Sequence, residues 1–518
     1  MNPIELNLFA NRLEAVCEQM GEVLRNAAFS PNIRDRLDYS CALFDAQGKL
    51  SAQAAHIPVH LGSMAFAMSS IVDQLEWAEG DQVILNNPFL GGTHLPDVTL
   101  IAPVFIENEL IAFVVNRAHH ANMGSESPGS MPVSSSLHEE GLVISPSYFF
   151  KQGELNQTLQ DQLLSGLGED DAMGDFSAQL SANRFGVQAL TAVILDKGKD
   201  YYRQGLVDLN DYAERLAKSA LADIPGGSYR FEDFMDDDGQ QNCSIKIKLE
   251  LQVTHAGIVA DFNGTAGQVQ GNINCPLSVA AAGIFYVFRC LMPEQTPACD
   301  GAFRRIQVLA PEGCLLNARF PAAVAAGNVE TSTRVVDVAL GALAQAIPDK
   351  IPAASHGSMN NIAMGSSEQG ATWNYYETIG GGMGAGSYGG GLSAVQTHMT
   401  NTLNTPVEVL ENRFPMLLTR YAIRRGSGGK GDVNGGDGIV RSFKFLKPAE
   451  ISVLTERRSF APWGLNAAQD GKTGINFLND EQMPAKFQRS LEVGAELTIM
   501  TPGGGGFNHT VQSLDKSS

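Results

Sequence analysis

The length, composition and charge of this chain exclude several broad classes of protein. It has 518 residues, of which 44% are hydrophobic and 18% are charged, and its formal net charge is −20. A chain of this size can bury large cores and suggests about two to four domains. The acidic balance, without any cluster of Lys and Arg, argues against nucleic acid as a partner, because phosphate binding needs a basic surface.

Membrane insertion and a disulfide scaffold are also disfavoured. The most apolar stretch, Leu277 to Phe288, is followed by Arg289 and is too short to span a bilayer, so it predicts a buried helix. The seven cysteines form no Cys-x-x-Cys pair, which is typical of a reducing compartment. Glu5 and Arg12 fall within the first helical pattern, which is not that of a signal peptide. We therefore expect a cytoplasmic protein without a membrane partner.

Helix-rich and strand-rich segments alternate along the chain. Asn2 supplies a capping side chain and Pro3 fits the first position of a helix. From this start the periodicity predicts a helix over 2–24, strands and tight turns over 38–144, helices over 175–222, a hairpin of strands over 243–253 and 257–262, helices over 277–291 and 330–347, and a strand over 449–454.

These elements predict an α+β protein of several domains, with mixed or antiparallel sheets, packed helices and a glycine-rich C-terminal third. Eight glycines occur in the twelve residues from Gly380 to Gly391. The first candidate boundary is the Pro225-Gly226-Gly227 step. We expect an N-terminal region that carries a metal site (1–225), a middle strand-rich region with two helices (226–350) and a glycine-rich region (351–518).

Two histidines and an aspartate are expected to meet at the open end of one hairpin. Two β-rich runs flank the polar step Glu107-Asn108, and they end close to Asp97 and His119. If the turn centres on this step, paired positions sum to 215, so Asp97 lies opposite Ala118. His94 stands three residues before Asp97. The sequence therefore outlines a site of two imidazoles and one carboxylate.

Imidazole and carboxylate ligands suit one divalent ion, Mn, Fe or Zn. The alternative is a polar, hydrogen-bonded turn, because His-x-x-Asp is a common pattern. A further acidic ligand would be Asp35 or Asp38, although a solvated turn would also explain both. His56 and His60 flank Pro58, which excludes a helical i, i+4 metal pair. They are candidates for orienting substrate near the site, or they have no role there.

Two other patterns have ordinary structural explanations. Gly384–Gly389 has the form G-x-G-x-x-G, but it lacks the preceding strand and the following helix of a dinucleotide site. A loop that lets the backbone approach a ligand and a simple tight turn both stay open. The run Glu330-Thr331-Ser332-x-Arg334 would suit an anion at a helix start, but an ordinary capped helix is favoured.

Nine blocks of this sequence closely resemble the hydantoinase B/5-oxoprolinase family. They follow the family order from about residue 5 to residue 507. The blocks are Arg36–Asp45, His56–Met64, Asn87–Asp97, Asn116–His120, Gly271–Asn274, Gly327–Ser332, Glu377–Gly382, Thr397–Thr402 and Pro502–Gly506.

The resemblance implies a B-type subunit, or the C-terminal half of a fused oxoprolinase, that works with an A-type ATPase subunit in a hetero-oligomer. ATP and Mg are then expected on the partner, and the substrate is a small cyclic amide: 5-oxoproline, hydantoin or N-methylhydantoin. Related ketone carboxylases hold a metal through residues that match His94, Asp97 and His119. Their acidic ligand would match Asp35, where the family pattern often has Glu, and Asp38 remains a competitor.

The resemblance also suggests a reaction sequence. The partner would phosphorylate the amide oxygen, and the metal site of this chain would then act on the activated ring. His120 or His60 would be the general base, with His56 nearby. Two other functions stay open: a subunit of an ATP-dependent acetone or acetophenone carboxylase, and a non-catalytic scaffold for the ATPase subunit.

Overall fold

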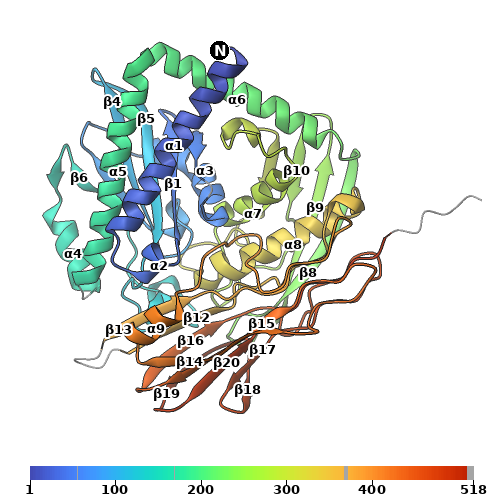
Figure 1. The fold of residues 1–518 in the computed structure, drawn as a ribbon. Coiled ribbons are helices and arrows are strands. Elements are labelled where there is room, and N and C mark those ends of the chain that lie inside the picture. Colours follow the sequence, from blue (N-terminus) through green and yellow to red (C-terminus); the bar gives the residue numbers. More distant parts are fainter. Residues whose placement is uncertain (55, 168–169, 367–371, 510–518) are drawn as a thin grey trace, which may run out of the picture.

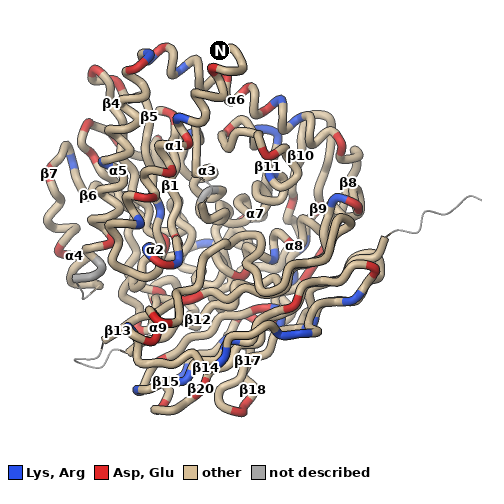
Figure 2. The backbone as a smooth tube through the Cα atoms, in the orientation of Figure 1, with Lys and Arg blue, Asp and Glu red and all other residues tan. Residues whose placement is uncertain are grey.

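The structure, a computed structural model, describes residues 1–54, 56–167, 170–366 and 372–509. Helices and mainly antiparallel sheets are layered against one another (Figure 1). The fold class predicted from the sequence is therefore confirmed. In the described ranges, no helix is both long and apolar enough to cross a membrane. Figure 2 shows acidic and basic residues interspersed along the backbone.

The first sheet is antiparallel throughout and carries the candidate site. Its strand order is β2-β1-β5-β4-β3-β6-β7. The strands are β1 (Tyr39–Asp45), β2 (Leu50–Gln53), β3 (Gln82–Leu85), β4 (Asp97–Ile106), β5 (Glu109–His119), β6 (Ser147–Lys151) and β7 (Glu154–Leu155).

Helices cover both faces of the first sheet. Successive side chains of a strand point to opposite faces, and on β5 the Asn116 amide donates to the Gln179 carbonyl of α5 (2.9 Å), while the Arg117 guanidinium donates to Ser63 Oγ of α3 (2.7 Å). On the α5 face, α1 packs against α5. The helices of the N-terminal region are α1 (Pro3–Ala27), α2 (Pro31–Arg34), α3 (Pro58–Val72), α4 (Gln157–Leu167), α5 (Asp170–Lys197) and α6 (Lys199–Leu221).

The first helix, α1, forms as the sequence predicts, whereas α3 contradicts one of the predictions. Asn2 caps α1 by accepting from the Glu5 amide, and Glu5 reaches back to the Asn2 amide, which together form a capping box. The prediction of strands and turns throughout 38–144 is wrong over Pro58–Val72. Pro58 occupies the first helical position, where its missing N–H costs nothing, so it begins a helix rather than preventing one.

The middle region contains the predicted hairpin and the two predicted helices. Its sheet has the order β11-β10-β9-β8, in which only β10 and β11 pair in parallel. A π-helical turn, Gly327–Thr331, leads directly into α8. The elements are β8 (Gly227–Asp237), β9 (Cys243–Val253), β10 (Ile258–Asp261), β11 (Ile306–Leu309), α7 (Leu277–Cys290) and α8 (Ser332–Leu343).

The C-terminal region is a pair of sheets with one apolar core between them. Their orders are β13-β12-β16-β19 and β14-β15-β20-β17-β18. The elements are β12 (Asn361–Ser366), β13 (Trp373–Glu377), α9 (Val407–Arg413), β14 (Met416–Arg424), β15 (Gly438–Phe445), β16 (Ala449–Leu454), β17 (Ile475–Leu478), β18 (Glu481–Met483), β19 (Lys486–Leu491) and β20 (Glu496–Met500).

Buried charges join the middle region to the C-terminal one. The guanidinium of Arg457, after β16, pairs with Asp233 of β8 at 2.8 Å and with Asp337 of α8. Arg334 pairs with Glu456 at 3.2 Å and also contacts Asp233. Arg334 therefore has carboxylate partners within the protein, which favours the ordinary helix over an anion site at this position.

Candidate metal centre

The β4–β5 hairpin forms as predicted, but its register differs by one residue. Glu107 and Asn108 form the turn, both with positive φ, as a two-residue hairpin turn requires. Near the turn the pairs sum to 215, but a bulge lies between Phe105 and Val104, and from there the pairs sum to 216. Asp97 therefore lies directly opposite His119, not opposite Ala118.

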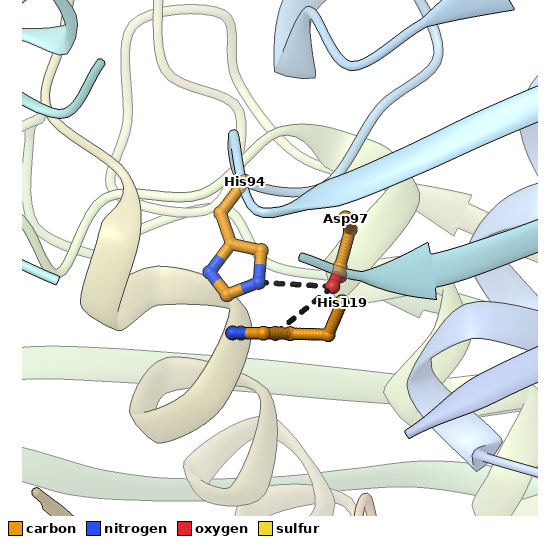
Figure 3. Close-up of side chains that lie close together, drawn as sticks. All are labelled: His94, Asp97 and His119. Atoms are coloured by element: carbon orange, nitrogen blue, oxygen red, sulfur yellow. Dashed lines mark ion pairs between the residues drawn. The ribbon is translucent and has the colours of Figure 1, made fainter. Parts of the chain in front are cut away.

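His94, Asp97 and His119 meet at the open end of this hairpin, with one ligand atom of each within 4.8 Å of the others (Figure 3). His94 Nε2 lies 3.1 Å from Asp97 Oδ1, and His119 Nδ1 lies 3.3 Å from the same oxygen. All three residues are at most 2% exposed. The predicted meeting of these side chains is confirmed, while their binding of a metal stays a prediction.

Neighbouring groups fix the orientation of the ligand atoms. Asp97 Oδ2 accepts from Thr93 Oγ1 (2.6 Å) and from Asn328 Nδ2 (3.0 Å). His94 Nδ1 donates to the Ala325 carbonyl (3.2 Å), which leaves Nε2 as the lone-pair nitrogen. Hydrogen bonds of this kind commonly orient metal-binding histidines and carboxylates.

Two atoms that face each other, His94 Nε2 and Asp97 Oδ1, are buried without hydrogen-bond partners. His119 Nε2 is also buried without one, but the His119 nitrogen that faces Asp97 Oδ1 is Nδ1. A lone-pair nitrogen 3.1 Å from a carboxylate oxygen is repulsive unless a cation or a proton lies between them. The donor set of two imidazoles and one carboxylate therefore fits a divalent transition metal.

The charges in the group stabilise one another. Burial alone would raise the pKa of Asp97, but the imidazoles of His94, His60 and His119 hold that pKa well below its usual range. Burial opposes the charged form of His94, yet Asp97 outweighs it and raises the pKa of His94. Burial lowers the pKa of His119, which favours its neutral, metal-binding form.

His60 and Asp38 lie beside the group. His60 Nε2 is 3.3 Å from Asp97 Oδ2 and 3.9 Å from Asp38 Oδ1, and Asp38 Oδ2 is 3.9 Å from His119 Nδ1. Both residues are buried. Asp38, rather than Asp35, is therefore the second carboxylate that the fold brings to the site.

Asp35, His56 and His120 are not brought into the group. Asp35 follows α2 and pairs with Arg34 at 3.0 Å. His56 Nδ1 accepts from the Cys41 amide at 3.1 Å. His120 follows His119 and points to the opposite face of the sheet, where its Nε2 lies 2.9 Å from Gln179 Oε1. Their predicted ligand and catalytic roles have no support from this geometry.

Two residues that contact the site were missed in the sequence. The Tyr376 ring of β13 stacks on His119, with centroids 4.6 Å apart and planes 8° from parallel. Asn328 lies in the π-helical turn, a feature common at functional sites. A Cβ on Gly327 would lie 1.8 Å from the Asn274 carbonyl oxygen, so only glycine permits this close approach. Their place in the sequence could have identified them: Asn328 lies inside one of the blocks that resemble the family, and Tyr376 immediately precedes another.

The chain is similar to proteins that are named 5-oxoprolinase or hydantoinase. It is 37% identical to a 5-oxoprolinase of Dictyostelium discoideum over 98% of this chain, but it spans only 40% of that protein. It is 30% identical to the putative B-type subunit of a D-/L-hydantoinase from a Pseudomonas species, covering 99% of this chain and 91% of that one.

Two solved structures share the fold. An ATP-dependent caprolactamase from Pseudomonas jessenii superposes with a TM-score of 0.91 at 25% identity, covering 98% of this chain and 91% of that one. Acetone carboxylase superposes with a TM-score of 0.85 at 16% identity, covering 98% and 76%. A family model described as hydantoinase B/oxoprolinase matches residues 2–510. The chain therefore belongs to the hydantoinase B/oxoprolinase family.

Proposed function

We propose that this chain is the B-type subunit of an ATP-dependent cyclic amidohydrolase that opens the ring of 5-oxoproline, hydantoin or N-methylhydantoin. The observation that carries the proposal is the buried group of His94, Asp97 and His119, in which His94 Nε2 and Asp97 Oδ1 face each other without hydrogen-bond partners. The names 5-oxoprolinase, hydantoinase and caprolactamase among its relatives support cyclic amides as the substrate class.

The group would hold one divalent ion, Mn, Fe or Zn, through His94, Asp97 and His119. When bound, such an ion lowers the pKa of a coordinated water towards neutrality or polarises a carbonyl group. Thr93 and Asn328 hold Asp97 through its other oxygen, so the oxygen that faces the histidines stays free.

ATP chemistry is assigned to an A-type partner subunit. An unactivated lactam is a poor electrophile, so phosphorylation of its amide oxygen would prepare the ring for attack by water. This sequence has no Walker A motif to support that step. A partner is also supported by the hydantoinase relative, whose name describes one subunit of a larger enzyme.

His60 is the residue best placed to move a proton at the site. Its Nε2 lies 3.3 Å from Asp97 Oδ2 and 3.9 Å from Asp38 Oδ1, and its Nδ1 lies 3.4 Å from Ser40 Oγ. A histidine held in this way would accept a proton from the attacking water and return it to the leaving nitrogen.

The test is to purify the chain with its A-type subunit and to measure ATP-dependent ring opening of 5-oxoproline and hydantoins, with acetone and bicarbonate as the comparison. His94→Ala should lose both metal and ring opening while the complex still assembles, and His255→Ala, at an exposed turn position, should lose neither. Full ring opening by a metal-free His94→Ala complex would contradict the proposal. Carboxylation of acetone without ring opening would replace it with the ketone carboxylase function.

A further inference from the structure

The two histidines of the metal group are held in different ways. His94 Nδ1 donates to the Ala325 carbonyl, so a hydrogen bond fixes the plane of its ring. His119 Nδ1 faces Asp97 Oδ1 at 3.3 Å, and its Nε2 is buried without a hydrogen-bond partner among the described residues. A metal-binding histidine usually donates through its second nitrogen, and this donation orients the ring. Another contact must therefore hold the His119 ring.

The orientation of the His119 ring decides where the lone pair of its nitrogen points. An imidazole binds a metal through this lone pair, which lies in the plane of the ring. The torsion about the Cβ–Cγ bond of a histidine has broad minima, so the bond itself holds the ring only loosely. Rotation about this bond would turn Nδ1 away from Asp97 Oδ1. The site therefore needs a contact that resists this rotation.

The Tyr376 ring lies flat against His119. The two ring centroids are 4.6 Å apart, and the ring planes are 8° from parallel. The His94 ring, by contrast, meets the His119 ring at 64°. Both Tyr376 and His119 are buried, and protein interiors are closely packed. Rotation of the imidazole about its Cβ–Cγ bond would bring its edge into the Tyr376 ring, so the stack resists this rotation.

Tyr376 is itself held by contacts that do not involve His119. Its backbone lies in β13, where it pairs with Ala363 of β12. Its hydroxyl donates to Asn361 Oδ1 at 2.6 Å. Arg36 Nη1 donates to the Tyr376 carbonyl at 2.8 Å, and the Arg36 guanidinium lies over the Tyr376 ring, with 4.9 Å between Cζ and the centroid. The tyrosine is therefore a fixed surface for the imidazole.

The π-helical turn that holds Asp97 also anchors Tyr376. Asn361 Nδ2 donates to Glu330 Oε1 at 2.6 Å, and Glu330 lies in this turn. Asn328 of the same turn donates to Asp97 Oδ2 at 3.0 Å. One turn in the middle region therefore orients one ligand directly and a second ligand through the tyrosine.

We propose that Tyr376 is a positioning residue of the metal group, and that its ring holds the His119 imidazole in the plane from which Nδ1 reaches the metal. The stack takes the place of the hydrogen bond that orients His94. The inference rests on the proposed function for the presence of the metal. It adds a residue of the C-terminal region to a site on the first sheet, and this residue acts only through His119.

The test is the affinity of the full chain, without ATP or partner, for Zn²⁺ and Co²⁺, measured by chelator competition. Tyr376→Phe keeps the stacked ring, so it should bind at most about threefold more weakly than the wild type. Tyr376→Leu removes the ring and should bind about 10- to 100-fold more weakly. The visible spectrum of the Co²⁺-loaded chain reports ligand geometry. It should change in Tyr376→Leu and stay unchanged in Tyr376→Phe.

Tyr375→Leu is the matched control for a purely structural role. Tyr375 is the neighbour of Tyr376 in β13 and is 2% exposed. Its side chain points to the opposite face of the sheet, where its hydroxyl donates to Glu377 Oε2. Tyr375→Leu should lower the melting temperature as Tyr376→Leu does, but it should keep the wild-type metal affinity and Co²⁺ spectrum. Equal losses of affinity in these two variants would overturn the positioning role.

A measurement on the metal-free wild type does not depend on the folding of any variant. The face of the Tyr376 ring should shift the NMR signal of the His119 ring proton upfield, and His119→Gln assigns this signal. Tyr376→Phe should retain the shift. A His119 signal at the position of an exposed histidine would show that the rings do not stack, and would overturn the inference.

The outcomes also separate this inference from the proposed function. A wild-type chain that binds neither ion would contradict the proposed function, and the role of Tyr376 in metal binding would fall with it. Wild-type affinity and an unchanged Co²⁺ spectrum in Tyr376→Leu would remove the role of Tyr376 alone and leave the metal group intact.

Discussion

Asp97 and His119 face each other directly because Ile111 is an additional residue in β5. Leu110 pairs with Phe105, but the next pair along the hairpin joins Val104 to Ala112. Without the bulge, Asp97 would lie opposite Ala118 instead of His119. Neighbouring residues of a strand point to opposite faces of the sheet, so the His119 side chain would then lie on the other face from Asp97. The metal group therefore depends on a one-residue irregularity about 25 Å away along the strand, at roughly 3.3 Å per residue.

Comparing substitutions of Asp38 and Asp35 identifies the second carboxylate of the metal group. Asp38→Asn should weaken metal binding by about 10- to 100-fold, because Asp38 lies 3.9 Å from a nitrogen of the ligand His119. Asp35→Asn should leave it within about twofold, because Asp35 pairs with Arg34 instead. Chelator competition measures both affinities. The opposite order would restore Asp35 as the ligand.

Asn328 should affect metal affinity although it offers no ligand atom. Its Nδ2 donates to Asp97 Oδ2, and Asn328→Ala would leave that oxygen with Thr93 and the more distant His60. The dissociation constant for metal should rise by about 10- to 100-fold. Asn401→Ala, at an exposed position, is the control. Equal affinities of the two variants would mean that the orientation of Asp97 does not depend on Asn328.

Substitutions of His60 and His120 should have clearly different effects on kcat. His60→Gln should lower kcat by about 10²- to 10⁴-fold with metal retained, because it removes the proton-transfer group beside Asp97. His120→Gln should change kcat little, since that ring faces Gln179 on the other side of the sheet. Steady-state rates of the complex with its A-type subunit test this. A larger loss in His120→Gln would make His120 the base.

Glu140 should make stability depend on pH near neutrality. Burial raises the pKa of Glu140 to about 7, although Ser134 and the amides of Val324 and Ala325 donate to its Oε1. The folded protein thus keeps a proton that the unfolded chain releases near its ordinary pKa of 4.5. The resulting stability is fully present below that value and is lost as the pH rises through 7.

Glu140→Gln should remove this dependence. Between pH 4.5 and 8 the wild-type free energy of unfolding should fall by about 3 kcal/mol relative to the variant. Urea unfolding at several pH values measures the difference, with the exposed Glu139→Gln as the control. Parallel pH profiles of wild type and Glu140→Gln would contradict a raised pKa at this position.

Local signals predict the parts of the fold that local chemistry determines. The capping box at Asn2 and Glu5 and the two-residue turn at Glu107 and Asn108 are visible in the sequence, and both form. The bulge at Ile111 is not visible, because an extra apolar residue in an apolar strand leaves the pattern unchanged. The helix at Pro58 is missed because a proline that ends one helix can also begin another.

The site is predictable where its residues lie on one hairpin and not where they come from distant segments. His94, Asp97 and His119 are predicted together for this reason. Tyr376 and Asn328 reach the site from β13 and from the π-helical turn, and only tertiary packing places them there. The choice between Asp35 and Asp38 depends on the turn after α2, where Leu37 has a positive φ that no local pattern indicates.

The most direct test of the account is elemental analysis of the complex with its A-type subunit, alongside the His119→Ala variant. The account predicts one equivalent of Mn, Fe or Zn per chain in the wild type and almost none in the variant, with ring opening lost in parallel. A wild-type complex that opens cyclic amides without a bound transition metal would contradict it.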